Sequence, residues 1–219
     1  MSSLHSILGR LKSRGLNINT VYDIGACNGS WSKQMKSYLP DADFFLFEAN
    51  PAYDDILAQT GFPYLCGQVL SNPGRETVEF YNGTNTGDSY YKETTKFYDN
   101  QTTVTLPCTT IDSLIEKFRL PPANFIKLDT QGSELDILAG AEGIINQVDL
   151  VLTECPIICY NKDAPNMQDY LDYFKARDFI PVAMCEEHVA EDTLVQIDLL
   201  FIKQETKQKF LSPNINIRV

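Results

Sequence analysis

Short apolar runs alternate with stretches of helical spacing along most of this chain. Leucine or isoleucine stands at positions 4, 7, 8 and 11, and this three- and four-residue spacing predicts an amphipathic helix over residues 4–16. The run TVYDIGA at 20–26 is a short apolar strand that stops at a glycine turn, and a helix is expected at 30–38. A second strand and helix follow at 43–51 and 53–59. Two such units in succession indicate a parallel sheet with helices on its faces.

The same alternation continues in the second half of the chain, after an irregular insertion. Further strands are expected at 64–70, 125–129, 150–154, 180–185 and 198–203, and further helices at 111–118, 134–141 and 167–176. Strands at 77–81 and 103–107 flank a polar, tyrosine-rich stretch, which predicts an inserted hairpin or lid over about 77–107. Because no internal repeat or linker breaks the pattern, residues 1–219 are expected to form a single α/β domain.

Charge and cysteine content narrow the classes of function. The net charge of -11 works against nucleic-acid binding, which depends on Lys and Arg displacing counterions from phosphates, so a neutral or small substrate is expected instead. The six cysteines lie in expected core strands without a secretory signal, which indicates reduced thiols and a cytoplasmic location. Cys155 and Cys159 lack a second ligand pair, so no structural zinc is expected. No apolar run reaches the roughly 20 residues of a transmembrane helix.

The first motif is DIGACNG, residues 23–29, where the first strand turns into the first helix. Gly25 and Gly29 would allow the backbone to pass close to a ligand. Their Gly-x-x-x-Gly spacing lacks the middle glycine of a dinucleotide-binding turn, which favours a cofactor without phosphate. An ordinary tight turn between strand and helix would have the same pattern.

Glu48 ends the second strand, at the same sheet edge as the glycine turn. A carboxylate there can accept hydrogen bonds from both hydroxyls of a ribose. The alternative is a solvated acid at a strand end. The glycine turn and Glu48 together favour a nucleoside.

The third motif is KLDTQGSE, residues 127–134, at the end of the strand predicted at 125–129. Ligands of open α/β sheets bind over the carboxyl ends of the strands, so Asp129 is expected to face the crevice with Asp23 and Glu48. Asp129 or Thr130 could instead cap the following helix, and Glu134 could favour its first turn.

These motifs resemble the FkbM-type methyltransferases, a branch of the class I S-adenosylmethionine-dependent enzymes. The blocks that carry the resemblance are VYDIGACNGSWS (21–32), FLFEANP (45–51), VLSNPG (69–74), TTIDSL (109–114), IKLDTQGSELDILAGA (126–141) and LVLTECP (150–156). Cys27 departs from the pattern, since the family often has asparagine there. The resemblance implies a Rossmann-like, mostly parallel seven-stranded sheet with helices on both faces and an antiparallel last strand pair. It also implies O-methylation of a hydroxyl, commonly on a sugar or polyketide-like metabolite.

The residues expected to bind S-adenosylmethionine are Asp23, Gly25, Ala26, Asn28, Gly29, Trp31, Glu48, Ala49, Leu70 and Asp129. The expected catalytic residues are Asp129, Glu134 and His188, and Glu154 is a further candidate for the base. His188 has a suitable intrinsic pKa, but it falls in a predicted polar loop where a histidine is often only solvated. Asp129 and neighbouring carboxylates could also bind a divalent cation that acidifies the hydroxyl, although no metal site is predicted because the ligand set is incomplete.

Two other functions fit the same pattern. A nicotinamide-dependent oxidoreductase would also use Glu48 on its ribose, and the missing glycine argues against it. A non-catalytic nucleoside-binding module would keep the fold without turnover. The oligomeric state and the identity of the acceptor do not follow from the sequence.

Overall fold

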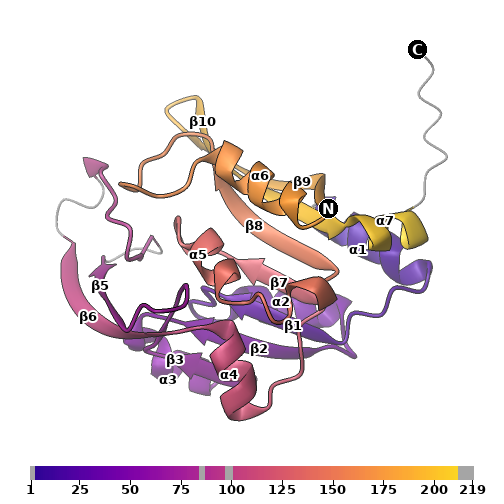
Figure 1. Ribbon diagram of the computed structural model, residues 1–219, viewed down its shortest axis with the longest axis horizontal. Coiled ribbons are helices and arrows are strands. Elements are labelled where there is room, and N and C mark those ends of the chain that lie inside the picture. Colours follow the sequence, from indigo (N-terminus) through magenta and orange to yellow (C-terminus); the bar gives the residue numbers. More distant parts are fainter. Residues whose placement is uncertain (1–2, 84–86, 97–100, 212–219) are drawn as a thin grey trace.

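A central seven-stranded sheet organises the computed structural model, which describes residues 3–83, 87–96 and 101–211 (Figure 1). Its strands, in spatial order, are β3 (Tyr64–Cys66), β2 (Asp43–Glu48), β1 (Thr20–Ile24), β7 (Phe125–Leu128), β8 (Leu150–Pro156), β10 (Thr193–Lys203) and β9 (Phe179–Ala190). The pairs from β3 through β8 are parallel, whereas β10 runs antiparallel to both β8 and β9. The predicted fold class is therefore confirmed.

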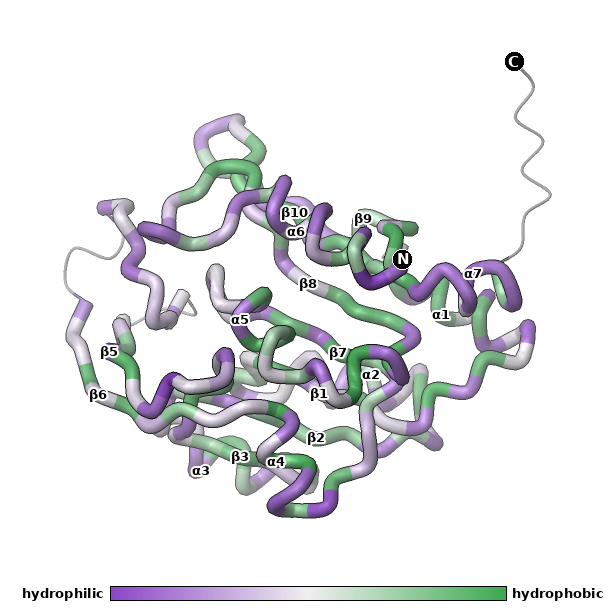
Figure 2. The backbone as a smooth tube through the Cα atoms, in the orientation of Figure 1, coloured by the Kyte–Doolittle hydropathy of each residue, from purple (hydrophilic) through white to green (hydrophobic). Residues whose placement is uncertain are grey.

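Helices cover both faces of this sheet (Figure 1). They are α1 (Ser3–Ser13), α2 (Ser30–Tyr38), α3 (Asp54–Ala58), α4 (Ile111–Phe118), α5 (Glu134–Ala139), α6 (Met167–Ala176) and α7 (Gln204–Phe210). Side chains of β1 alternate between two buried clusters, with Tyr22 and Ile24 facing α4, α5 and α6, and Val21 facing α1, α2 and α3. The start of β8 is hydrophobic and its carboxyl end is more polar (Figure 2).

Three predicted strands differ from the structure. The single strand expected at 64–70 is wrong, because Gly67 adopts a φ of +79° and its N–H bonds to the Glu48 carbonyl, which separates β3 from β4 (Val69–Leu70). β4 instead joins β6 (Thr102–Thr109) and β5 (Thr77–Asn82) in a second, three-stranded sheet. In addition, β9 and β10 extend well beyond the predicted strands, because they pair with each other along almost their whole length.

Part of the predicted lid falls within this second sheet. The strands expected at 77–81 and 103–107 correspond to β5 and β6, which pair in antiparallel register. Residues 84–86 and 97–100 of the lid lie outside the described residues. Within the described ranges, no helix combines the length and apolar composition that crossing a membrane requires.

Candidate functional site

A cavity of about 490 Å³ lies over the carboxyl ends of the parallel strands. It spans the point between β1 and β7 where the strand order reverses, the usual position of a ligand in an open α/β sheet. The predicted residues that line it are Gly25, Ala26, Asn28, Trp31, Glu48, Ala49, Leu70, Asp129 and His188. The predicted residues Asp23, Gly29 and Glu134 do not line it. Its volume is in the range of small-molecule sites.

The glycine turn brings two strand ends into close contact. Gly25 has a φ of +74°, and a Cβ added to it would lie 1.9 Å from the Asp129 carbonyl oxygen. Gly25 is therefore required first by the neighbouring backbone, and it lines the cavity as well. At Gly29, with a φ of +72°, a Cβ would meet the side chains of Thr60 and Leu46 at 3.0 and 3.1 Å. A glycine at position 29 therefore allows close packing against β2 and the turn after α3.

Glu48 presents its carboxylate to the cavity from the end of β2, with 8% of the residue exposed. One oxygen accepts the Cys27 N–H at 2.7 Å and the other accepts the Asn50 N–H at 2.8 Å. Burial raises the pKa of Glu48, and these two hydrogen bonds oppose that rise. Because a carboxylate oxygen has two lone pairs, each can accept a further hydrogen bond from a ligand.

Lys127, which is not among the predicted site residues, is a buried cation in the lining of the cavity. Its Nζ lies 3.1 Å from Asp23 Oδ1 and 3.2 Å from Asp129 Oδ2, and it donates to the Gly25 carbonyl at 2.9 Å. Burial alone would lower the pKa of Lys127, but the charges of Asp129 and Asp23 outweigh it and raise that pKa. Ser32 donates to the other Asp23 oxygen at 2.6 Å. Asp23 thus supports the cavity floor through Lys127. A lysine within the otherwise apolar strand FIKL is the feature of the sequence that could have indicated this ion pair.

Glu134 shapes the loop that carries Asp129. Its buried carboxylate accepts the N–H groups of Thr130 and Gly132, both at 2.9 Å, and the Tyr170 hydroxyl. Burial raises the pKa of Glu134, whereas these hydrogen bonds oppose the rise. These contacts fix the turn between β7 and α5 and leave the Asp129 side chain 42% exposed toward the cavity.

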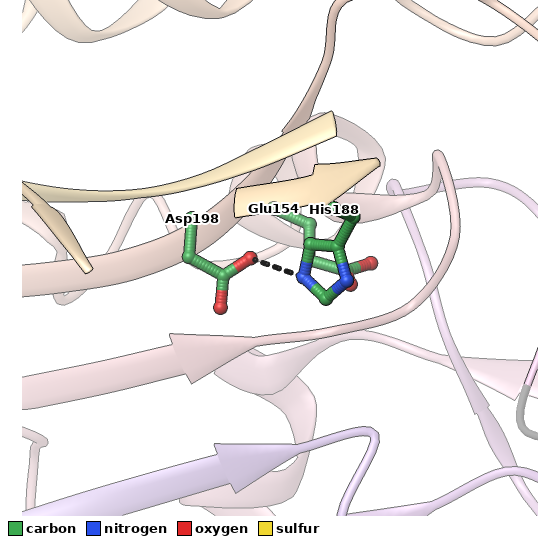
Figure 3. Close-up of side chains that lie close together, drawn as sticks. All are labelled: Glu154, His188 and Asp198. Carbon is green, nitrogen blue, oxygen red and sulfur yellow. Dashed lines mark ion pairs between the residues drawn. The ribbon is translucent and has the colours of Figure 1, made fainter. Parts of the chain in front are cut away.

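Three side chains converge at the other end of the cavity: Glu154 at the end of β8, His188 on β9 and Asp198 on β10 (Figure 3). The prediction that His188 lies in a loop is wrong, because the residue pairs with Gln196 inside the extended β9–β10 hairpin. Its Nε2 lies 3.5 Å from Asp198 Oδ1. Burial raises the pKa of Glu154 well above its usual value, and Asp129 and Glu134 add to the rise. Burial and the charge of Asp129 also raise the pKa of Asp198 to about 6, against the opposing influence of His188.

Two glutamines hold Glu154 in place. Gln131 donates to one carboxylate oxygen at 2.7 Å, and Gln196 donates to the other. The Tyr160 hydroxyl contacts the side-chain oxygens of both glutamines. Asp198 and Gln196 are site residues beyond those predicted, although the one charged residue in the otherwise apolar run IDLLFI, residues 197–202, could have indicated Asp198.

The described part of the predicted lid is anchored to the core. The hydroxyls of Tyr90 and Tyr91 donate to Asp136 on α5 at 2.7 and 3.0 Å. Asn50, next to the end of β2, donates to Asp88 at 2.7 Å. These contacts place Tyr90 and Asp88 in the cavity wall. That the predicted lid is mobile stays a prediction.

Comparison with known proteins relates the chain to methyltransferases. The family model described as the methyltransferase FkbM domain matches residues 23–181. No curated protein matches the chain in sequence. Among solved structures, magnesium protoporphyrin IX methyltransferase from Synechocystis PCC 6803 with bound SAM has a TM-score of 0.50 at 10% identity, over 92% of this chain and 78% of that one. A fibrillarin/Nop5p complex matches with a TM-score of 0.50 at 11% identity, over 90% and 80% of the two chains. These structural similarities concern the fold.

Proposed function

The chain belongs to the FkbM methyltransferase family, and we propose that it is an S-adenosylmethionine-dependent O-methyltransferase acting on a hydroxyl of a sugar, glycan or other small metabolite. One observation carries this proposal. A single cavity joins the buried carboxylate of Glu48 at one end to Asp129, Glu154 and His188 at the other. A nucleoside cofactor and an acceptor can therefore meet within one cavity.

The residues at the first end fit the cofactor. Glu48 keeps lone pairs for the two ribose hydroxyls, since the Cys27 and Asn50 N–H groups use one on each oxygen. Apolar side chains of Val69, Leu70 and Phe80 line the adjacent wall and would suit a flat heterocycle. The glycine turn leaves space beside Ala26 for the remainder of the molecule.

The methyl group of the bound sulfonium is already an electrophile, so the chain itself has to align an acceptor oxygen, exclude water and remove a proton. Orientation of this kind contributes roughly 7 to 11 kcal/mol in favourable cases. Asp129 is the proposed proton acceptor, because its partly exposed carboxylate faces the cavity and the rigid Glu134-bound loop fixes its position. His188 and Glu154 lie on the acceptor side of the same space. Glu134 acts as a positioning residue.

The polarity of the acceptor end favours a hydroxylated substrate. Gln131 and Gln196 offer amide groups, and Asp129, Glu154 and Asp198 offer carboxylates, so hydroxyls of a sugar ring would find acceptors on several sides. Tyr90 adds a flat aromatic surface to the wall. An anionic acceptor would instead meet several carboxylates of its own sign.

The test is mass spectrometry of a metabolite extract and a glycan library after incubation with the protein and S-adenosylmethionine carrying a deuterated methyl group. The proposal predicts a labelled product with the methyl on oxygen, formed by the wild-type chain and lost in Asp129→Asn. A label on nitrogen or carbon would contradict O-methylation. A product that forms equally without the protein would contradict methyl transfer by this site.

A further inference from the structure

Glu154, His188 and Asp198 form a compact group on three neighbouring strands (Figure 3). The antiparallel register places Asp198 opposite Glu154 across the β10–β8 pair. On the other side of β10, His188 lies opposite Gln196, two residues from Asp198. As a result, one nitrogen and two carboxylate oxygens, one from each side chain, all lie within 4.8 Å of one another. We infer that this group, called here the strand-end triad, binds a divalent metal ion at the acceptor end of the cavity.

The distances suit a metal after a small adjustment. His188 Nε2 and Asp198 Oδ1 are 3.5 Å apart. Two ligands at the usual bond length of about 2.1 Å would subtend roughly 110° at that separation, which is a normal coordination angle. All three ligand atoms lie within 4.8 Å of one another, and two such bonds can span about 4.2 Å. Rotation of the side chains within their rotamer wells would bring all three atoms into bonding range of one ion.

Two polar atoms of the triad lack hydrogen-bond partners among the described residues. His188 Nε2 and Asp198 Oδ1 are both buried at the atomic level and neither makes a hydrogen bond within the described part of the chain. Their mutual distance of 3.5 Å is too long for a strong hydrogen bond. Buried polar atoms of a native protein usually have a partner, and an ion held between them would satisfy both.

The third ligand, Glu154, is already oriented as a metal ligand would be. The amide groups of Gln131 and Gln196 each donate to one of its oxygens, which fixes the direction of the carboxylate and leaves lone pairs free. Hydrogen bonds from surrounding side chains to ligating carboxylates are a general feature of metal sites. The contact of Tyr160 with both glutamines extends this support.

The charge at this end of the cavity also favours a cation. Asp129, Glu154, Glu186 and Asp198 all line it. Lys127, the one lysine or arginine among the described lining residues, is already paired with Asp23 and Asp129. A divalent ion would balance the excess negative charge, because closely spaced carboxylates in a partly buried site repel one another.

The ligand set indicates the class of ion and its use. One imidazole with two carboxylates is a mixed nitrogen and oxygen set, suited to Mn²⁺ or Zn²⁺ more than to the oxygen-only preference of Ca²⁺. Three protein ligands leave positions for an acceptor hydroxyl, whose proton would become more acidic on coordination. This use of the ion rests on the proposed methyl transfer, whereas binding of the ion itself does not.

The experiment titrates the intact, chelator-treated chain with MnCl₂ alone and follows free Mn²⁺ by electron paramagnetic resonance, without cofactor or acceptor. The wild type should bind one ion per chain. His188→Ala and Asp198→Asn should each weaken Mn²⁺ binding at least about tenfold. Replacing a residue that only supports a metal ligand already costs about 10- to 100-fold in affinity, and loss of a ligand itself should cost no less. Glu187→Gln is the matched control, because this exposed neighbour of His188 carries the same charge as a ligand and lies outside the cavity lining.

Circular dichroism and thermal unfolding check that each variant is folded. Absence of binding in the wild type, or equal affinity in the wild type and both ligand variants, would overturn the metal site and leave His188 and Asp198 as a metal-free pair. Methyl transfer is measured separately with the deuterated cofactor. Failure of the metal inference with a labelled product still formed is therefore distinguishable from failure of the proposed function.

Discussion

Replacing Lys127 with methionine should destabilise the fold strongly, because it leaves a buried carboxylate without its cation. Asp23 has no exposed surface and the Lys127 side chain is 7% exposed, so water cannot replace the ion pair at Asp23. Asp129, the other partner, is 42% exposed and can be solvated. Methionine keeps most of the apolar stem of lysine, so little of the effect comes from packing. Removing one partner of a buried pair costs about 3 to 5 kcal/mol, and we expect a loss of unfolding free energy in that range.

Urea unfolding followed by far-UV circular dichroism measures this loss by linear extrapolation. Lys33→Met, on the exposed face of α2, is the matched control and should change the free energy of unfolding by no more than about 0.5 kcal/mol. The double variant Lys127→Met/Asp23→Asn removes the stranded charge and should recover more than about 1 kcal/mol relative to Lys127→Met. A loss below about 1 kcal/mol for Lys127→Met, or no recovery in the double variant, would refute the assignment of Lys127 as the counterion of Asp23.

Three further predictions concern the cavity and its wall. Gly25→Ala should weaken S-adenosylmethionine binding at least about tenfold in titration calorimetry, since the new Cβ would lie 1.9 Å from the Asp129 carbonyl oxygen. The control Gly9→Ala, whose Cβ would enter open space beside α1, should bind the cofactor normally. Asp129→Asn should lower turnover of the identified acceptor by about 10²- to 10⁴-fold with the cofactor dissociation constant nearly unchanged, and near-normal turnover would exclude Asp129 as the base. Asp136→Ala should speed hydrogen exchange at residues 87–96, because Tyr90 and Tyr91 lose their shared acceptor, and unchanged exchange would mean that other contacts hold the segment.

The sheet and the cofactor end of the site follow closely from local sequence. The apolar strands and the turns after them determine where Gly25 and Glu48 lie, because carboxyl ends of neighbouring parallel strands meet at one edge. The reason why positions 25 and 29 require glycine could not be predicted in the same way. Gly25 is required by the Asp129 carbonyl, and Gly29 by Thr60 and Leu46, which are contacts between segments distant in sequence.

The grouping of Glu154, His188 and Asp198 depends on pairing between strands distant in sequence, which local patterns do not encode. The polar sequence around His188 predicts a loop, yet pairing with β10 extends the strand past this residue. Asp198 enters the cavity through its register with Glu154, and no spacing rule connects those positions. The role of Glu134 as an acceptor for loop N–H groups likewise appears only when Thr130 and Gly132 are placed around it.

S-adenosylmethionine is expected to bind this cavity with its ribose on Glu48. Titration calorimetry of the wild type, Glu48→Gln and the exposed control Glu116→Gln with S-adenosylmethionine and with NAD⁺ tests it most directly, after circular dichroism has shown that all three are folded. Loss of charge-assisted hydrogen bonds worth about 1.5 to 3 kcal/mol should weaken binding by Glu48→Gln about 10- to 150-fold, with the control unchanged. The wild type should bind S-adenosylmethionine at one site per chain and in preference to NAD⁺. Preference for NAD⁺, or equal affinity of the wild type and Glu48→Gln for S-adenosylmethionine, would contradict the account.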